Sequence, residues 1–140
     1  RGVEAKAKFK IKELSIAGNY AFTKSTNELA TNPLDNTVGE QLRYVPLHKG
    51  NISFTLTKDN LKYSLNTSYT GEVITSHTYL NNNILDGFTL TDIAIKYTLE
   101  KLPITLVGKV KNLLDKSYTT YQNYPNPGRE LLLTINYTIN

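Results

Sequence analysis

The chain has 140 residues, a formal net charge of +4, ten Tyr and four Phe, and it contains no Met, Cys or Trp. The lack of Cys excludes a disulfide framework and a cysteine metal site, and no run reaches the ~18 apolar residues of a transmembrane helix. A chain of this length is ordinarily one domain, and the absence of an initiator Met leads us to expect a processed product or a fragment.

The first segment, residues 2–12, alternates strictly between apolar and charged residues. One face would carry Val3, Ala5, Ala7, Phe9 and Ile11, and the other Glu4, Lys6, Lys8, Lys10 and Lys12. Successive side chains of a strand point to opposite faces, so this pattern predicts a two-faced strand. Its lysine face fits either a solvated edge strand of a soluble sheet or the polar interior of a membrane barrel.

The same alternation returns in six later segments. They span residues 14–23, 50–57, 61–69, 88–99, 104–111 and 129–140. In the segment that begins with Phe88, the apolar residues move from even to odd positions, which predicts a β-bulge near Thr91 and Asp92. The sequence therefore predicts an all-β, antiparallel chain of seven strands, with residues 42–47 as a weak candidate for an eighth.

The connections between these segments alternate in length. Short turns fall at residue 13 and at residues 58–60 and 100–103, and long polar loops at residues 24–49, 70–87 and 112–128. Transmembrane barrels have short periplasmic turns and long extracellular loops. We therefore expect all three long loops to lie at one end of a transmembrane barrel, outside the cell.

The last part of the chain carries a family pattern. NLLDKSY begins at Asn112, a tyrosine-rich loop follows, and YPNPGRELLLTINYTI comes next. This resembles the C-terminal end of TonB-dependent outer-membrane receptors: Asn-Leu-Phe-Asp-Lys-x-Tyr, a loop, Pro-Gly-Arg, and an alternating strand ending in Tyr-x-Phe. Leu114 replaces the usual Phe, and Ile139, followed by Asn140, replaces the terminal aromatic residue. Upstream, GVEAKAKFKI, LSIAGNYAFT and YVPLHKGNISFTL also resemble late strands of this family.

The resemblance implies a fold and a role. Receptors of this family are plugged barrels of about 22 strands, so residues 1–140 would be the C-terminal portion of the barrel, with the plug domain and the earlier strands absent. The whole receptor would lie in the outer membrane of a Gram-negative bacterium. It would import a scarce ligand, such as a ferric siderophore, haem or cobalamin, with energy supplied by TonB, and it would not be an enzyme.

The resemblance also implies partners. These are outer-membrane lipid and lipopolysaccharide, the receptor's own plug and remaining strands, TonB through the plug, the barrel-assembly machinery during biogenesis, and a small-molecule ligand. No nucleic-acid partner is expected, because many lysines alternate along one strand instead of clustering on a surface with aromatic platforms. No cofactor, metal site or catalytic residue is expected either, since His48 and His77 lack a spaced partner carboxylate and no catalytic motif is present.

Three sets of residues are assigned an expected role. Aromatic and amide residues of the long loops are candidate ligand contacts, because Tyr offers a flat face and a hydroxyl, with loop packing as the alternative: Tyr79, Asn82, Tyr118, Tyr121 and Tyr124. The charged residues expected to face the barrel lumen are Glu4, Lys6, Lys8, Lys10, Lys62, Lys96, Lys109 and Lys111. The apolar residues expected to face lipid are Val3, Phe9, Ile16, Phe54, Leu65, Ile95, Leu106 and Ile135.

Two other classes of protein stay open at this point. A small complete outer-membrane barrel, an adhesin or a structural protein, requires an even number of strands in a bacterial single chain, which the weak segment 42–47 would supply. A soluble lipocalin-like barrel would bind its ligand inside and place the apolar faces inward. Alternation in the sequence does not tell which face is inside.

Overall fold

The computed structural model describes residues 1–35, 37–77 and 84–139. Among these residues, no helix is long and apolar enough to cross a membrane. The chain is all-β. Its strands are β1 (Gly2–Ile11), β2 (Leu14–Thr23), β3 (His48–Lys58), β4 (Leu61–Thr70), β5 (Val73–Ile74), β6 (Ile84–Leu85), β7 (Phe88–Thr98), β8 (Ile104–Lys111), β9 (Thr119–Tyr121), β10 (Tyr124–Pro125) and β11 (Glu130–Tyr137).

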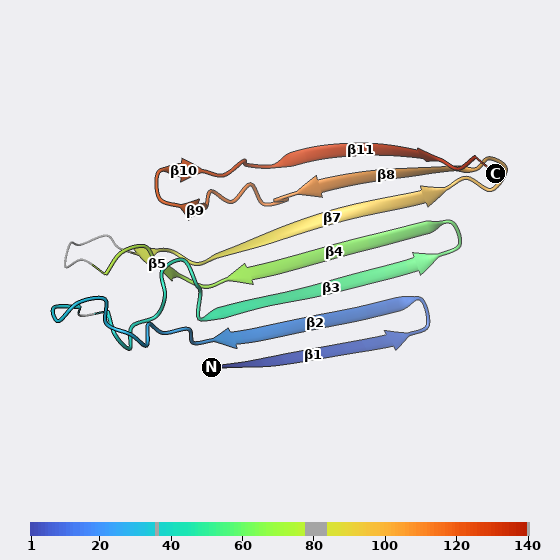
Figure 1. The fold of residues 1–140 in the computed structure, drawn as a ribbon. Helices are drawn as coiled ribbons and strands as arrows, with labels where there is room; N and C mark the ends of the chain where they lie inside the picture. The colour runs from blue at the N-terminus through green and yellow to red at the C-terminus, as the bar shows by residue number, and fades with distance from the viewer. Residues whose placement is uncertain (36, 78–83, 140) are drawn as a thin grey trace.

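Seven long strands form one antiparallel sheet in the order β1-β2-β3-β4-β7-β8-β11, so each strand pairs with the long strand next to it in the chain (Figure 1). This confirms the seven predicted strands and their antiparallel order. The short pairs β5–β6 and β9–β10 form separate two-stranded sheets within the second and third long loops. Residues 42–47 form no strand in the described structure, so the weak eighth strand was wrong.

Two of the three short connections are two-residue turns. Ile11 pairs with Leu14 and Lys58 pairs with Leu61, which leaves two residues in each loop. The first residue of each loop, Lys12 in one and Asp59 in the other, has a φ value of 52° and 50° respectively. Two-residue hairpin loops place central residues in this left-handed region because it matches the twist of the flanking strands. The tight turns therefore fix the register of both hairpins.

The predicted β-bulge near Thr91 and Asp92 was wrong. The pairing of β4 with β7 runs without a shift from Leu61–Tyr97 to Thr70–Phe88. Phe88 therefore lies on the same face as the polar side chains of the sheet, where its ring lies 4.6 Å from that of Tyr118 in the third long loop. The apolar residues change face along β7 because the loop covers the end of the polar face, and no break in register is needed.

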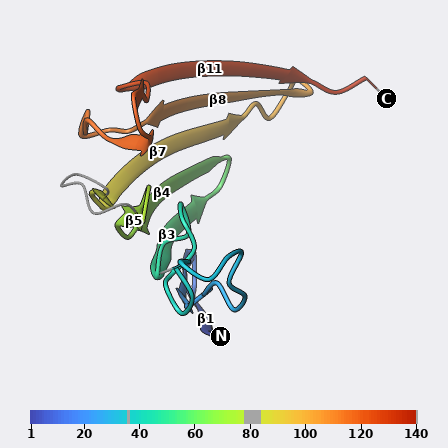
Figure 2. The same ribbon diagram turned by 60° about the vertical axis from the view of Figure 1, so that its left-hand side comes forward.

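The sheet is curved and open, with β1 and β11 as its edges (Figure 2). Register assigns the lipid-facing candidates to one side, which we call the apolar face. No hydrophobic side chain is buried among the described residues, and on the apolar face Phe9 is 63% exposed and Leu65 37%. On the opposite side, the polar face, the central strands carry Ser53, Asn66 and Ser68, all half-buried.

This distribution is the reverse of that in a soluble domain. Large apolar side chains are exposed, while small polar ones are partly covered. Monomeric soluble proteins rarely expose a contiguous apolar patch larger than a few hundred Å², and a sheet of seven strands with one apolar face exceeds that size. The outward apolar and inward polar alternation is the arrangement of a transmembrane β-barrel.

Candidate functional site

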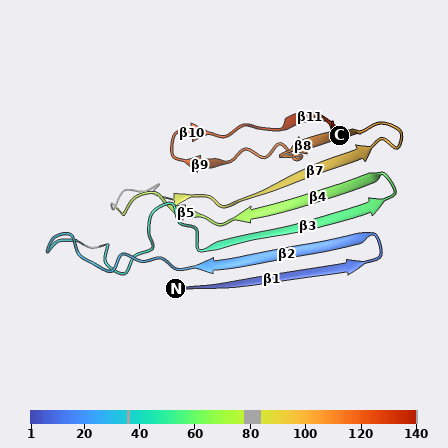
Figure 3. The same ribbon diagram turned by 45° about the vertical axis from the view of Figure 1, so that its right-hand side comes forward.

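The three long loops lie at one end of the sheet, and the three short turns lie at the other (Figures 1 and 3). This confirms that the alternation of connection lengths sorts the loops to one end. The loop end carries Tyr118, Tyr121 and Tyr124 of the candidate set, whereas Tyr79 and Asn82 lie outside the described residues. Binding residues commonly lie on loops that a rigid scaffold positions, so this end is where a ligand site is sought.

The first long loop is organised by a carboxylate. The Asp35 side chain accepts hydrogen bonds from the backbone N–H and the hydroxyl of Thr31, at 2.8 Å each, and from the N–H and hydroxyl of Thr37, at 3.0 and 2.6 Å. These bonds, led by the one from the Thr31 N–H, hold the pKa of Asp35 well below its usual range. The carboxylate therefore stays charged and closes the tip of the loop at neutral pH.

Tyr44 connects the first loop to both others. Its backbone N–H donates to the carbonyl of Ile74 in the second loop at 2.8 Å. Its ring stacks on Tyr121 of the third loop, with centroids 4.7 Å apart and an interplanar angle of 25°. Tyr44 also has a φ of 58°, which is uncommon for a bulky residue. Tyr44 thus joins its own loop to the two others from a strained backbone conformation, and no pattern in the sequence singled it out.

The third loop is closed at its base by two side chains of the family pattern. Asn112 is 4% exposed; its Oδ1 accepts from the Lys116 N–H and its Nδ2 donates to the Lys116 carbonyl, both at 2.9 Å. Asp115 accepts from the Arg129 N–H at 2.8 Å, where the chain enters β11. A Cβ at Gly128 would lie 2.7 Å from Asp115 Oδ1, so a larger residue there would displace the carboxylate from the Arg129 N–H.

The predicted tyrosines of the third loop have different surroundings. Tyr121 and Tyr124 pair with each other across the β9–β10 hairpin, and their side chains are 58% and 73% exposed. Tyr118 is half-buried against Phe88. Two tyrosines therefore present free surface at the loop end, while the third is engaged in packing.

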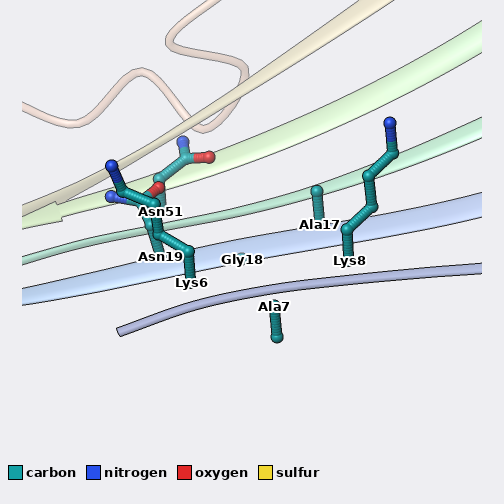
Figure 4. Close-up of a pocket in the computed structure, with 7 residues that line it drawn as sticks. All are labelled: Lys6, Ala7, Lys8, Ala17, Gly18, Asn19 and Asn51. Atoms are coloured by element: carbon teal, nitrogen blue, oxygen red, sulfur yellow. The ribbon is translucent and has the colours of Figure 1, made fainter. Parts of the chain in front are cut away.

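Register places the eight predicted lumen-facing residues on the polar face. Lys6 pairs with Asn19, Lys62 with Lys96, and Lys111 with Glu130. Figure 4 shows Lys8 and Ala17 on one side of the strands and Ala7 on the other. Beside them is an open depression of about 380 Å³ whose polar lining residues are Lys6, Lys8, Asn19 and Asn51.

Tyrosines on the apolar face fall near the strand ends. Tyr20 and Tyr69 lie toward the long loops, and Tyr63, Tyr97 and Tyr137 lie toward the short turns. Barrels in the outer membrane carry girdles of aromatic residues at both membrane interfaces, flanking an apolar band about 25 Å tall. The positions of these five tyrosines fit two such girdles.

The described residues contain no group of three or more His, Cys, Asp and Glu that could hold a metal ion. His48 contacts Tyr20, whose hydroxyl lies 2.7 Å from the imidazole Nδ1, and its ring lies 5.4 Å from that of Phe22. His48 thus has aromatic neighbours at the loop end of the sheet, and these contacts account for it structurally.

A family model of the TonB-dependent receptor-like β-barrel matches residues 1–113, most of the chain. The chain belongs to the TonB-dependent receptor β-barrel family. This confirms the family that the sequence resemblance indicated, from a match that lies almost wholly upstream of the C-terminal pattern. It also places the protein in the outer membrane of Gram-negative bacteria, where the family resides. It disfavours both the small complete barrel and the soluble lipocalin-like barrel.

Solved structures share the fold. The unliganded ferric citrate transporter FecA has a TM-score of 0.78 and 19% identity; the match covers 94% of this chain and 23% of FecA. The siderophore receptor PiuA from Acinetobacter baumannii has a TM-score of 0.77 and 20% identity; the match covers 97% of this chain and 21% of PiuA. The FrpB iron transporter from Neisseria meningitidis has a TM-score of 0.74 and 19% identity; the match covers 97% of this chain and 23% of FrpB. The chain spans about a fifth of the length of these proteins, which are transport receptors.

Proposed function

We propose that residues 1–140 form the C-terminal part of the barrel wall of a receptor that imports a scarce ligand across the outer membrane with energy supplied through TonB. The observation that carries this is the seven-stranded sheet with an exposed apolar face and a polar face, in a chain of this receptor family. The earlier strands and a plug would lie in the rest of the receptor, because the matched proteins are about five times as long.

In this proposal the apolar face contacts outer-membrane lipid and the polar face lines the lumen. Lipid surrounds the exposed apolar side chains, and lipopolysaccharide meets the wall toward the loops. The barrel-assembly machinery would insert the strands, and the plug would connect the receptor to TonB. The protein would act by transport and not by catalysis.

The long loops would supply part of the ligand site. Tyr121 and Tyr124 have free aromatic surface next to Tyr44, and a flat aromatic surface with hydroxyls suits a planar or metal-chelating ligand. Tyr118 would support the loop through Phe88. Tyr79 and Asn82 stay candidates from the sequence. Because the matched proteins include a siderophore receptor and a ferric citrate transporter, a ferric chelate is the favoured ligand class, with haem and cobalamin as the other candidates.

Uptake by whole cells tests this function. Cells that lack the full-length receptor, and the same cells with the gene restored, would be given radioactive iron as a catecholate chelate, a citrate chelate or haem, and separately labelled cobalamin. We expect restored uptake of one of these probes, abolished by a proton uncoupler because TonB-linked import requires energy. Uptake unchanged by the receptor for every probe would contradict the proposed function.

A further inference from the structure

Charge is unevenly distributed along the polar face. Its three strand carboxylates each have a lysine partner: Glu4 with Lys6 at 3.6 Å, Asp92 with Lys109 at 3.3 Å, and Glu130 with Lys111 at 2.9 Å. Counted from the long-loop end, Glu4 is the third residue of β1 and Glu130 is the first residue of β11. Asp92 lies in the half of β7 nearer that end. The part of the wall nearest the long loops therefore neutralises most of its own charge.

The half nearest the short turns has no such compensation. On the polar face of the described strands it carries Lys8, Lys10, Lys62 and Lys96 and no Asp or Glu. These four lysines are exposed, and none forms an ion pair within the described residues. Within the described strands, nothing balances the positive charge of this half.

The uncompensated charge is most concentrated at Lys62 and Lys96, because they lie directly opposite each other on β4 and β7. Like charges in a cross-strand pair destabilise a sheet. Their neighbours in the same row are Thr57 on β3 and Val107 on β8, which carry no charge. Inside a barrel the supply of water is limited, so two adjacent uncompensated ammonium groups are costlier than on an open surface.

We propose that Lys62 and Lys96 form a docking site for a carboxylate on a segment of the same receptor that lies inside the barrel, outside residues 1–140. Cα atoms opposite each other in an antiparallel pair are about 5 Å apart, so two lysine side chains can reach one carboxylate. Charge-assisted hydrogen bonds to it would replace the repulsion between the two ammonium groups. The inference rests on the proposed function, which makes the polar face the lumen wall.

A segment of the receptor fits this site better than a free anion. The chain spans about a fifth of the proteins that it matches, so most of the polypeptide lies elsewhere and is large enough to supply such a segment. A tethered carboxylate has a high effective concentration and neutralises the pair continuously. A transported anionic ligand would do so only during its passage.

Carbodiimide coupling, which joins an amine to a carboxylate in contact with it, tests the docking site directly. The full-length receptor in detergent would be treated, digested and mapped by mass spectrometry. The ion pair between Lys111 and Glu130 is the internal positive control. We expect cross-linked peptides that join Lys62 or Lys96 to an Asp or Glu of the same polypeptide outside residues 1–140.

Three outcomes would overturn the proposal. One is a positive control that cross-links while Lys62 and Lys96 do not. Another is cross-links from these lysines only to residues 1–140 or to a second molecule. A third is the absence of such cross-links together with weaker uptake of a ferric chelate by the K62Q/K96Q variant, which would assign the pair to the transported anion. Cross-linking does not require transport, so its result is separable from the uptake experiment.

Variants supply a second measurement. K62Q/K96Q removes two charges from the pair, and K12Q/K101Q removes the same charge from two short turns at that end of the sheet. Protease added to the full-length receptor should cut the interior segment several-fold faster in K62Q/K96Q than in wild type or K12Q/K101Q. High salt should accelerate cutting of wild type more than of K62Q/K96Q, since it screens an interaction that the variant lacks. Equal rates in the two variants would contradict the docking role.

Discussion

The strands and the long loops of this chain are held in different ways. In the sheet, each long strand pairs with its sequence neighbour in an unbroken register, as from Gly2–Thr23 to Ile11–Leu14. In the loops, the order depends on single contacts, such as the four hydrogen bonds to Asp35 and the stack of Tyr44 on Tyr121. The wall is thus held by the same backbone pairing repeated along every strand. The loop end is held by a few individual side-chain contacts.

This difference has a consequence for mutation. The effect of a substitution in the wall depends on whether the side chain meets lipid or water. Two adjacent residues of one strand lie on opposite faces, so the same charged substitution should be costly at one and tolerated at the other. A substitution in the loops acts through its particular partner, and partners in other loops should respond with it. Four experiments test this difference between wall and loops.

The largest effect is expected at the apolar face of β11. Leu133 is 76% exposed in the middle of the strand. Leu133→Arg should destabilise the folded receptor by about 2–4 kcal/mol, the cost of Arg on the lipid face near the bilayer midplane. Thr134→Arg, one residue further and on the polar face, should cost much less. Urea titration of the full-length receptor in lipid vesicles measures both, and equal losses would refute the assignment of the faces.

The base of the third loop should be the next most sensitive place. Asn112→Ala removes both side-chain hydrogen bonds to Lys116 from a buried position with a φ of 48°. Leaving those backbone groups unsatisfied should cost about 1–3 kcal/mol. The loop should then be cut faster by protease near residues 116–124. Leu114→Ala, at an exposed side chain of the same loop, is the control, and a similar change in both variants would contradict the role of Asn112.

A smaller effect is expected at the exposed tyrosines. Alanine at Tyr121 or Tyr124 should weaken ligand binding by about 1 kcal/mol or more if either is an anchor, which is roughly fivefold or more in affinity. Tyr121→Phe keeps the ring that stacks on Tyr44 and should retain most of the affinity if flat area is what binds. Binding of a ferric chelate to whole cells, normalised to surface expression, measures this.

Tyr118→Ala serves as the matched comparison for these variants. Because Tyr118 packs on Phe88, its loss should affect protease resistance of the loop more than ligand affinity. Unchanged affinity in the Tyr118, Tyr121 and Tyr124 triple alanine variant would assign all three residues to loop packing. The ligand site would then lie in other loops or in the interior of the receptor.

The smallest effect is expected from the charge of Asp35. Hydrogen bonds from Thr31 and Thr37 depress its pKa in the folded loop below the ordinary value of 3.8. The carboxylate therefore contributes stability above that value, and the contribution falls as pH drops from about 4 toward the depressed pKa of the folded state. The amide protection factors of Thr31 and Thr37, which compare the measured exchange rate with the intrinsic rate at the same pH, should be unchanged between pH 7 and 5 and lower below pH 4. Asp35→Asn should remove this pH dependence, and an unaltered profile would contradict the role of the carboxylate.

The architecture of the wall could be predicted from the amino-acid sequence. Alternation of period two located seven strands, because it depends only on residues that are near in the chain. The sequence placed the first two short turns at residues 13 and 58–60, and the structure shows that they are two-residue loops at residues 12–13 and 59–60. The alternating lengths of the connections sorted the loops to one end. The pattern from Asn112 to Arg129 gave the family, since each of its residues has a local role: Asn112 and Asp115 cap the loop base, and Gly128 admits the close approach of the carboxylate.

Contacts between residues that are distant in the chain could not be predicted from the sequence and are seen only in the folded chain. The sequence predicted a bulge in β7 because Phe88 is apolar where the polar face begins, but contact with Tyr118 of a later loop makes that position apolar without one. Tyr44 joins Ile74 and Tyr121, which lie 30 and 77 residues further along the chain. The opposition of Lys62 and Lys96 depends likewise on the pairing of β4 with β7 across the second long loop. Alternation specifies the face of each residue, but register and loop packing specify its neighbour.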